Sequence, residues 1–198
     1  MKSYHPTIWR TCRVLANPRR IACLKAVLKG PGECVGELAA RAHVGETYAS
    51  LALRSLQARG LIAARRESRW VRYFPEPDPL VPAAAAVLNG LRDALMCAQW
   101  PTKDVVRLLT AFTHPRRLTL LSDLQTEGPT TFDALAQACR ISPPALYRHL
   151  KKLERRQLVR GENDVWSLAS RPCPLAAVFL SLIAQTEAPP RMAKGHTR

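Results

Sequence analysis

Basic side chains recur at helical spacing between residues 142 and 156, where Arg148, Lys151 and Lys152 fall within about one turn. An arginine guanidinium can donate two hydrogen bonds to the major-groove edge of guanine, and lysine ammonium groups can neutralise phosphates. Three leucines of the same segment share the opposite face and are expected to be buried. The spacing therefore predicts a helix with one apolar face and one face suited to duplex DNA. The alternative is an ordinary solvated basic face.

An earlier segment, 46–59, has the same leucine spacing but a different outward face, on which Leu51 replaces the arginine. Its hydroxyls can hydrogen-bond base edges, and its leucine can contact a thymine methyl group. A hairpin rich in arginine follows this segment, and an arginine inserted into a narrow minor groove is a common DNA contact. We expect Trp70 and Tyr73 of this hairpin to be core or strand-pair residues. The candidate DNA contacts are Thr47, Ser50, Leu51, Arg54, Arg65, Arg66, Arg69, Pro144, Tyr147, Arg148, Lys151 and Lys152.

The sequence repeats itself at an offset of 97 residues. Pro18-Arg19-Arg20 falls on Pro115-Arg116-Arg117, and ten positions are identical without a gap between residues 17 and 62 and their counterparts. Each copy has the same order of features: a helix, a second helix opened by proline, a Gly-Pro turn, a short helix, a longer helix, a hairpin and a closing helix. This order is typical of a winged helix-turn-helix.

The repeat predicts the domain organisation. We expect a winged-helix domain at 1–98, with its wing at about 61–74 and a closing helix at 80–97. A second would occupy 99–187, with its wing at about 158–168, and 188–198 would be a disordered tail. The fold class is mainly α with small β-hairpins (α+β).

The segments 14–77 and 109–168 resemble ArsR/SmtB-type regulators, in the motif Cys34-Val35-Gly36-Glu37-Leu38-Ala39, the wing Arg66–Tyr73 and the helix Ser142–Leu153. The resemblance implies a cytoplasmic, nucleoid-associated bacterial transcriptional regulator that dimerises through its first and last helices. Here two copies are fused, so helices at 7–16, 80–97, 102–112 and 175–187 are expected to pack as an intramolecular pseudo-dimer. A homodimer of chains is left open.

Charge agrees with this interpretation. The chain has a net charge of +15, of which +10 lies in residues 1–74, whereas residues 75–100 carry −2. A positive field of this kind attracts nucleic acid or an acidic membrane surface. No apolar run is long enough to span a membrane, and the N-terminus lacks the apolar segment of a secretory signal.

The resemblance also implies a metal or metalloid site at the third helix, for which Cys34 and Glu37 are candidates, with Cys97 or Cys12 to complete a set. Thiolates would suit zinc or an arsenic-like ion. We favour no cofactor and interpret Cys34 as a small buried apolar residue; a redox-sensing thiol is a further alternative. The histidines His43, His114 and His149 are scattered along the sequence, and no catalytic constellation is recognisable, so we expect no enzyme.

These observations predict a sequence-specific regulator, acting as a repressor, that binds an asymmetric operator of two half-sites. The alternatives are a winged-helix protein-interaction module, for which Leu51-Ala52 on the reading face would be the surface, and a nonspecific architectural DNA binder.

Overall fold

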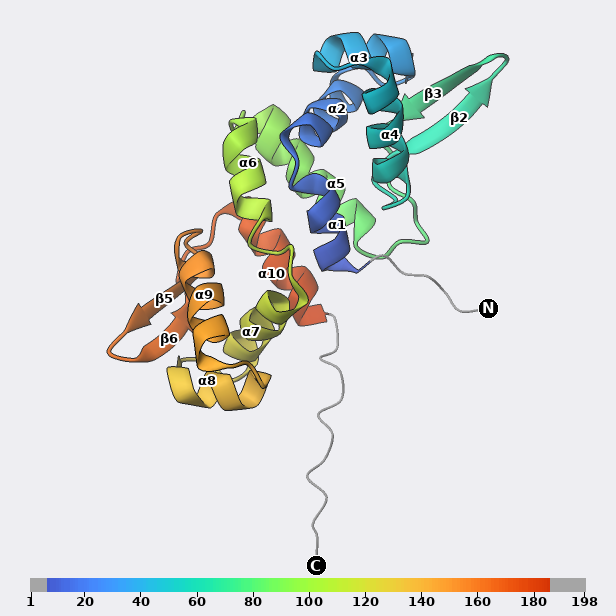
Figure 1. Cartoon of the computed structure of the whole chain (residues 1–198). Helices are drawn as coiled ribbons and strands as arrows, with labels where there is room; N and C mark the ends of the chain where they lie inside the picture. The colour runs from blue at the N-terminus through green and yellow to red at the C-terminus, as the bar shows by residue number, and fades with distance from the viewer. Residues whose placement is uncertain (1–6, 186–198) are drawn as a thin grey trace, which may run out of the picture.

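The computed structural model describes residues 7–185, in which two series of elements follow one another in the same order (Figure 1). The first half contains α1 (Ile8–Leu15), α2 (Pro18–Lys29), β1 (Glu33–Cys34), α3 (Val35–Ala42), α4 (Glu46–Gln57), β2 (Ala63–Glu67), β3 (Trp70–Phe74), α5 (Ala84–Arg92) and the π-helical turn η1 (Asp93–Cys97). The second half contains α6 (Thr102–Leu109), α7 (Pro115–Thr126), β4 (Thr130–Thr131), α8 (Phe132–Cys139), α9 (Pro143–Glu154), β5 (Val159–Glu162), β6 (Val165–Leu168) and α10 (Pro174–Gln185).

The 97-residue offset of the sequence recurs in the structure: α2 to α4 and α7 to α9 have equal lengths and begin 97 residues apart. The start of α2 illustrates the local cause. The Asn17 side chain accepts a hydrogen bond from the Arg20 backbone N–H at 3.1 Å, and Pro18 occupies the first helical position. In α7, His114 Nδ1 caps the helix in the same way by accepting from the Arg116 N–H at 3.2 Å. Both caps satisfy a backbone donor that the helix itself leaves free.

Each half has a three-stranded antiparallel sheet rather than a hairpin alone, because a two-residue strand joins it, in the orders β1-β3-β2 and β4-β6-β5. Tyr73 pairs with Glu33 and Ala64, and Trp166 takes the corresponding place beside Thr130 and Gly161. Between these pairs and the hairpin tip, the first hairpin has three more residue pairs and the second has one. At about 3.3 Å per residue, the first hairpin extends about 7 Å further.

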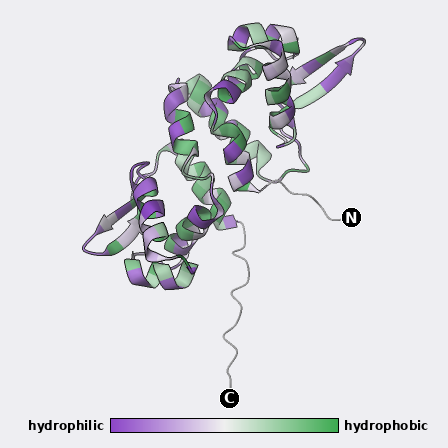
Figure 2. Ribbon diagram, in the orientation of Figure 1, coloured by the Kyte–Doolittle hydropathy of each residue, from purple (hydrophilic) through white to green (hydrophobic). Residues whose placement is uncertain are grey.

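One continuous core includes buried residues of both halves. Helix α6 packs against α1 and α2, and α10 packs against α5. The Phe112 and Phe179 rings stack with centroids 4.9 Å apart. At Gly90 of α5 a Cβ atom would lie 3.2 Å from a methyl group of Val178 in α10, so the glycine permits this close approach. Figure 2 shows hydrophobic residues concentrated on α10 at the centre of the molecule.

The first closing helix differs from the prediction. It begins at Ala84 instead of Leu80, and Leu80 is 79% exposed. Val81 precedes Pro82, which disfavours helical backbone at that residue, and the Asp78 side chain accepts from the Leu80 N–H at 2.9 Å in a turn. The predicted tail at 188–198 lies outside the described residues. None of the described helices is long and apolar enough to cross a membrane.

Candidate nucleic-acid interface

The turn between α8 and α9 fixes the direction of α9. Arg140 ends α8 in the left-handed region with φ 50°, and the Ile141 N–H donates to the Ala136 carbonyl at 3.1 Å. Pro143 then begins α9. The same turn joins α3 to α4, where His43 has φ 53°. Both halves therefore contain the short helix, tight turn and long helix of a helix-turn-helix.

The buried and exposed faces of α9 are those predicted. Its three leucines are fully buried, Tyr147 is 54% exposed, and Arg148 is exposed with its Nε donating to the Pro144 carbonyl of its own helix at 3.3 Å. Lys151 and Lys152 are only half-exposed. Burial lowers the pKa of Lys152, and nearby Arg117 and Arg156 lower it further. The role of each side chain in DNA contact stays a prediction.

A groove of about 610 Å³ runs along the C-terminal half of α9. Its lining has one acidic residue, Glu154, against five basic ones, and Arg155 adds a cation that our set of candidate contacts omits. The sequence signal for Arg155 is its place at the end of a basic helix, where an exposed side chain is expected. The residues that line the groove are Tyr147, Arg148, Lys151, Lys152, Glu154, Arg155 and Arg156.

Arg156, which lines this groove, and Arg117, which does not, donate hydrogen bonds to other parts of the protein. Arg117 is 5% exposed and donates to the carbonyls of Ala111 at 2.5 Å and Thr110 at 3.0 Å. Arg156 donates through Nη2 to Thr110 Oγ1 at 2.9 Å. Carbonyls that follow the end of a helix lack helical partners and attract cations. These arginines therefore hold α6 to α7 and α9.

In the first half, α4 presents a weakly charged face. Leu51 is 58% exposed, Thr47 and Arg54 are exposed, and Ser50 is half-exposed. Ala52, expected beside Leu51 on the reading face, is instead buried. Consecutive residues of a helix point in different directions, and Ala52 lies on the core side of α4. Apart from Arg54, the first half therefore offers hydroxyl and apolar groups where α9 offers cations.

The first hairpin carries more cations than α4, whose outward face has Arg54 alone among the candidate contacts. Arg66 and Arg69 are exposed, and Arg65 is paired with Glu76 while lying over the Phe74 ring at 4.6 Å. Trp70 is a strand-pair residue as expected but is not in the core: it is 50% exposed, opposite Glu67. The reason is that the Glu67–Trp70 pair lies next to the hairpin tip, outside the three-stranded part of the sheet.

The second hairpin is shorter and mostly acidic. Arg160 pairs with Glu162 at 3.3 Å, and Asn163 and Asp164 form the tip with positive φ. The halves thus distribute charge oppositely: the first has a cationic hairpin and a neutral helix, and the second has a cationic helix and an acidic hairpin.

Two histidines treated as scattered along the sequence are neighbours in the structure. The His114 and His149 ring centroids lie 4.8 Å apart, which joins the start of α7 to α9. Burial lowers the pKa of both histidines, and nearby arginines lower it further. For His149 the neighbouring His114 also contributes, and the pKa of His149 falls to about 4. His114 must also be unprotonated at Nδ1 to accept the Arg116 N–H.

We therefore expect stability to fall as the pH falls below 6.5. An unfolded histidine binds a proton near pH 6.5, whereas His149 stays neutral in the folded protein down to about pH 4, so the unfolded state binds more protons in this window. The free energy of unfolding of the wild type, measured with urea, should be about 1–2 kcal/mol lower at pH 4.5 than at pH 7 because of His149, allowing for solvent screening. His149→Gln should reduce that difference, and His43→Gln, at an exposed position, should not. An equal effect of both variants would contradict this assignment.

Two of the candidate metal residues, Cys34 and Glu37, are hydrogen-bonded to each other at the start of α3. The Cys34 backbone N–H donates to Glu37 Oε2 at 2.7 Å, and this bond lowers the pKa of Glu37. The pair thus caps the start of α3. Cys34 is only half-buried, so our interpretation of it as a buried apolar residue is wrong. Cys12 is buried, which raises the pKa of its thiol, and Cys97 is exposed. Within residues 7–185, no three His, Cys, Asp or Glu side chains gather as metal ligands.

Comparison with known proteins agrees with this geometry over part of the chain. No curated protein matches the sequence. Residues 112–162, from the end of the α6–α7 connection through α9 to β5, match the family model described as a helix-turn-helix domain. The second half therefore contains a helix-turn-helix domain of the kind that DNA-binding regulators use.

Proposed function

We propose that the protein is a sequence-specific regulator of transcription that binds double-stranded DNA and acts as a repressor in the cytoplasm, with no enzymatic activity. The observation that supports this most is the exposed basic face of α9 inside the matched helix-turn-helix domain. In this arrangement α9 enters the major groove, Arg148 contacts guanine, and lysines contact phosphates.

We also propose that the halves arose as a tandem pair and form an intramolecular pseudo-dimer of ArsR-like winged helices. Figure 1 supports this, because α3, α4 and one hairpin lie at one end of the molecule, and α8, α9 and the other hairpin lie at the opposite end. The helices between them pack α1 against α6 and α5 against α10. First and last helices are the elements through which the resemblance implies dimerisation.

The unequal halves favour an asymmetric operator. On the second half-site α9 would specify bases, and on the first the arginines of the β2–β3 hairpin would add minor-groove and phosphate contacts. Half-sites on one face of the duplex lie about one helical turn apart. A single chain should therefore select a motif that is not palindromic.

Selection from a random duplex pool, with and without thiol-binding metals, tests this proposal. Arg148→Ala is expected to relax specificity at one base position at a cost of about 1–3 kcal/mol, since a bidentate arginine–guanine contact is lost. Arg66→Ala should weaken binding to all sequences alike. A palindrome selected by a monomeric chain, or the same specificity in Arg148→Ala and wild type, would contradict the proposal.

A second candidate function is favoured by the exposed Leu51 on α4: the first half binds another protein rather than DNA bases. Leu51→Ser would then leave DNA selection unchanged. If the first half contacts bases, the same substitution should alter preference at one position. A nonspecific architectural binder would show a strong salt dependence without any selected motif.

A further inference from the structure

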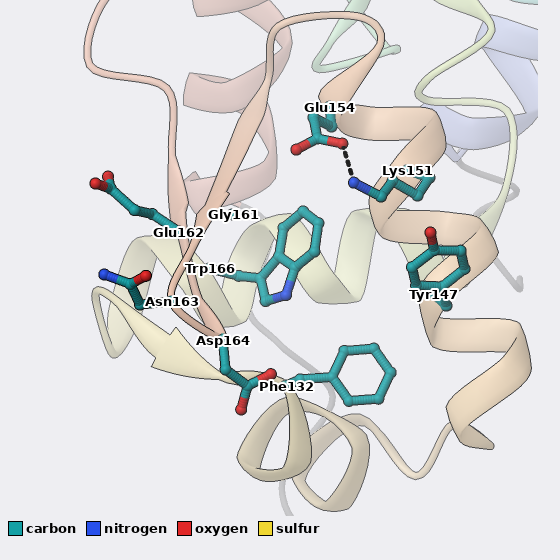
Figure 3. Close-up of a pocket in the computed structure, with 9 residues that line it drawn as sticks. All are labelled: Phe132, Tyr147, Lys151, Glu154, Gly161, Glu162, Asn163, Asp164 and Trp166. Atoms are coloured by element: carbon teal, nitrogen blue, oxygen red, sulfur yellow. Dashed lines mark hydrogen bonds and ion pairs between the residues drawn. The ribbon is translucent and has the colours of Figure 1, made fainter.

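A pocket of about 390 Å³ opens between α9 and the β5–β6 hairpin. Figure 3 shows three aromatic side chains around it: Trp166 from the hairpin, Tyr147 from α9 and Phe132 from the start of α8. The Lys151–Glu154 pair lies at one edge, and the hairpin tip lies at the other. Sites of this volume with mostly apolar walls and a few polar groups bind small molecules.

The Trp166 indole is held in place by its cross-strand neighbour. A Cβ atom at Gly161 would lie 2.9 Å from the Trp166 ring, so the ring packs directly against the glycine backbone. The same side chain is 7% exposed. Its position is therefore set by the sheet.

The surroundings of the pocket favour positive charge. The Lys151 ammonium lies 5.6 Å from the centre of the Trp166 ring and 5.8 Å from that of Tyr147, within the range of cation–π attraction. It also pairs with Glu154 at 2.7 Å. The lining has three carboxylates, those of Glu154, Glu162 and Asp164, and one cation, Lys151, while Glu162 also pairs with Arg160 outside the lining. An ammonium group of the protein itself thus occupies the position that a ligand cation would prefer.

The first half provides an internal comparison. At the 97-residue offset, Phe132, Tyr147 and Glu154 correspond to Val35, Ser50 and Gln57. The winged-helix fold is therefore formed in the first half without two of the three aromatic residues and without this carboxylate. The aromatic and acidic lining is thus a property of the second half and not a requirement of the fold.

We propose that this pocket binds a small organic cation, such as a quaternary ammonium compound, with the positive charge among Trp166, Tyr147 and Phe132. The ligand displaces the Lys151 ammonium, and Glu154 then pairs with the ligand. Rings of this kind bind cations that have a thin hydration shell, because their faces are electron-rich. This inference goes beyond the proposed DNA binding and does not depend on it.

Titration of the protein alone with benzyltrimethylammonium and choline, followed by NMR, tests the inference. The four tryptophans give four indole N–H signals, and Trp166→Phe assigns one of them. We expect the Trp166 signal to shift on titration, and 3,3-dimethylbutan-1-ol, the neutral analogue of choline, to bind at least about tenfold more weakly. Magnesium at the same concentration should leave the signal unchanged, since it keeps its water shell and so does not bind against aromatic ring faces.

Substitutions copied from the first half provide matched variants. Tyr147→Ser and Glu154→Gln should each lower the affinity for the cation about fivefold to tenfold, because the first loses a ring face and the second loses a negative charge. Lys151→Met should strengthen binding about threefold or more, because it removes the competing ammonium. Equal affinity for the neutral analogue, the same shift with magnesium, or no change in any variant would overturn the proposal. Tyr147 and Lys151 are also candidate DNA contacts, so the cation titration is done without DNA and the DNA affinity of each variant is measured separately.

Discussion

Replacing Arg65, Arg66 and Arg69 together by serine is expected to lower the affinity for DNA by about 100-fold to 1000-fold at physiological salt, and to reduce the slope of log K against log[salt] by about 2–3. All three side chains are exposed on the hairpin that projects furthest from the body. Their contacts are expected to be with phosphates and the minor groove, and each neutralised phosphate contributes about 0.9 to the slope. Fluorescence anisotropy with a selected duplex between about 50 and 200 mM salt measures both quantities.

The matched control is Arg160→Ser on the β5–β6 hairpin. Arg160 lies on a short hairpin whose other charged residues, Glu162 and Asp164, repel phosphate, so its loss should change affinity no more than about twofold. Equal losses from both hairpins would mean that charge acts through the net field of the protein and not through defined contacts.

Replacing Arg117 by methionine is expected to lower the free energy of unfolding by about 2–4 kcal/mol, since carbonyls of Ala111 and Thr110 lose their buried donor. Methionine retains most of the apolar volume, which limits the cavity contribution. Urea unfolding at pH 7 measures the difference.

Arg20→Met is the corresponding substitution in the first half. Arg20 makes one long hydrogen bond, 3.3 Å to the Val14 carbonyl, and is only half-buried, so its loss should cost less than about 1 kcal/mol. For Arg117→Met, one effect acts against the loss of hydrogen bonds. Burial and the nearby positive charge of Arg156 lower the pKa of Arg117, and removing the guanidinium relieves this repulsion. Greater stability of Arg117→Met than of wild type would mean that relief of this repulsion outweighs the hydrogen bonds.

Local signals in the sequence predict the helices and their faces. Leu53 and Leu56 of α4 and the three leucines of α9 recur at helical spacing, and these five are buried as that spacing requires, whereas Leu51 lies on the outward face and is exposed. Strands β1 and β4 were not predicted, because two residues are too few to show a period and their pairing with β3 and β6 is not local. The length of each hairpin beyond the body follows from this pairing, and so could not be obtained from the sequence.

The candidate site divides in the same way. Arg116 and Arg117 are adjacent in the sequence, yet the first is exposed and the second is buried against α6. His114 and His149 come together only when α7 packs against α9. Trp70 and Trp166 both lie in hairpins. Only the register of each sheet places Trp166 in the three-stranded part and Trp70 next to the hairpin tip.

In the proposed mode of binding, with one half on each half-site, the continuous core restricts the spacing of the operator. Because buried residues of both halves belong to one cluster, α4 and α9 cannot change their separation without breaking that cluster. Tandem domains on a flexible linker tolerate spacers of several lengths between their targets. In that mode, five inserted base pairs, about half a helical turn, would rotate one half-site to the far side of the duplex, where the half held by the shared core within residues 7–185 would not reach it.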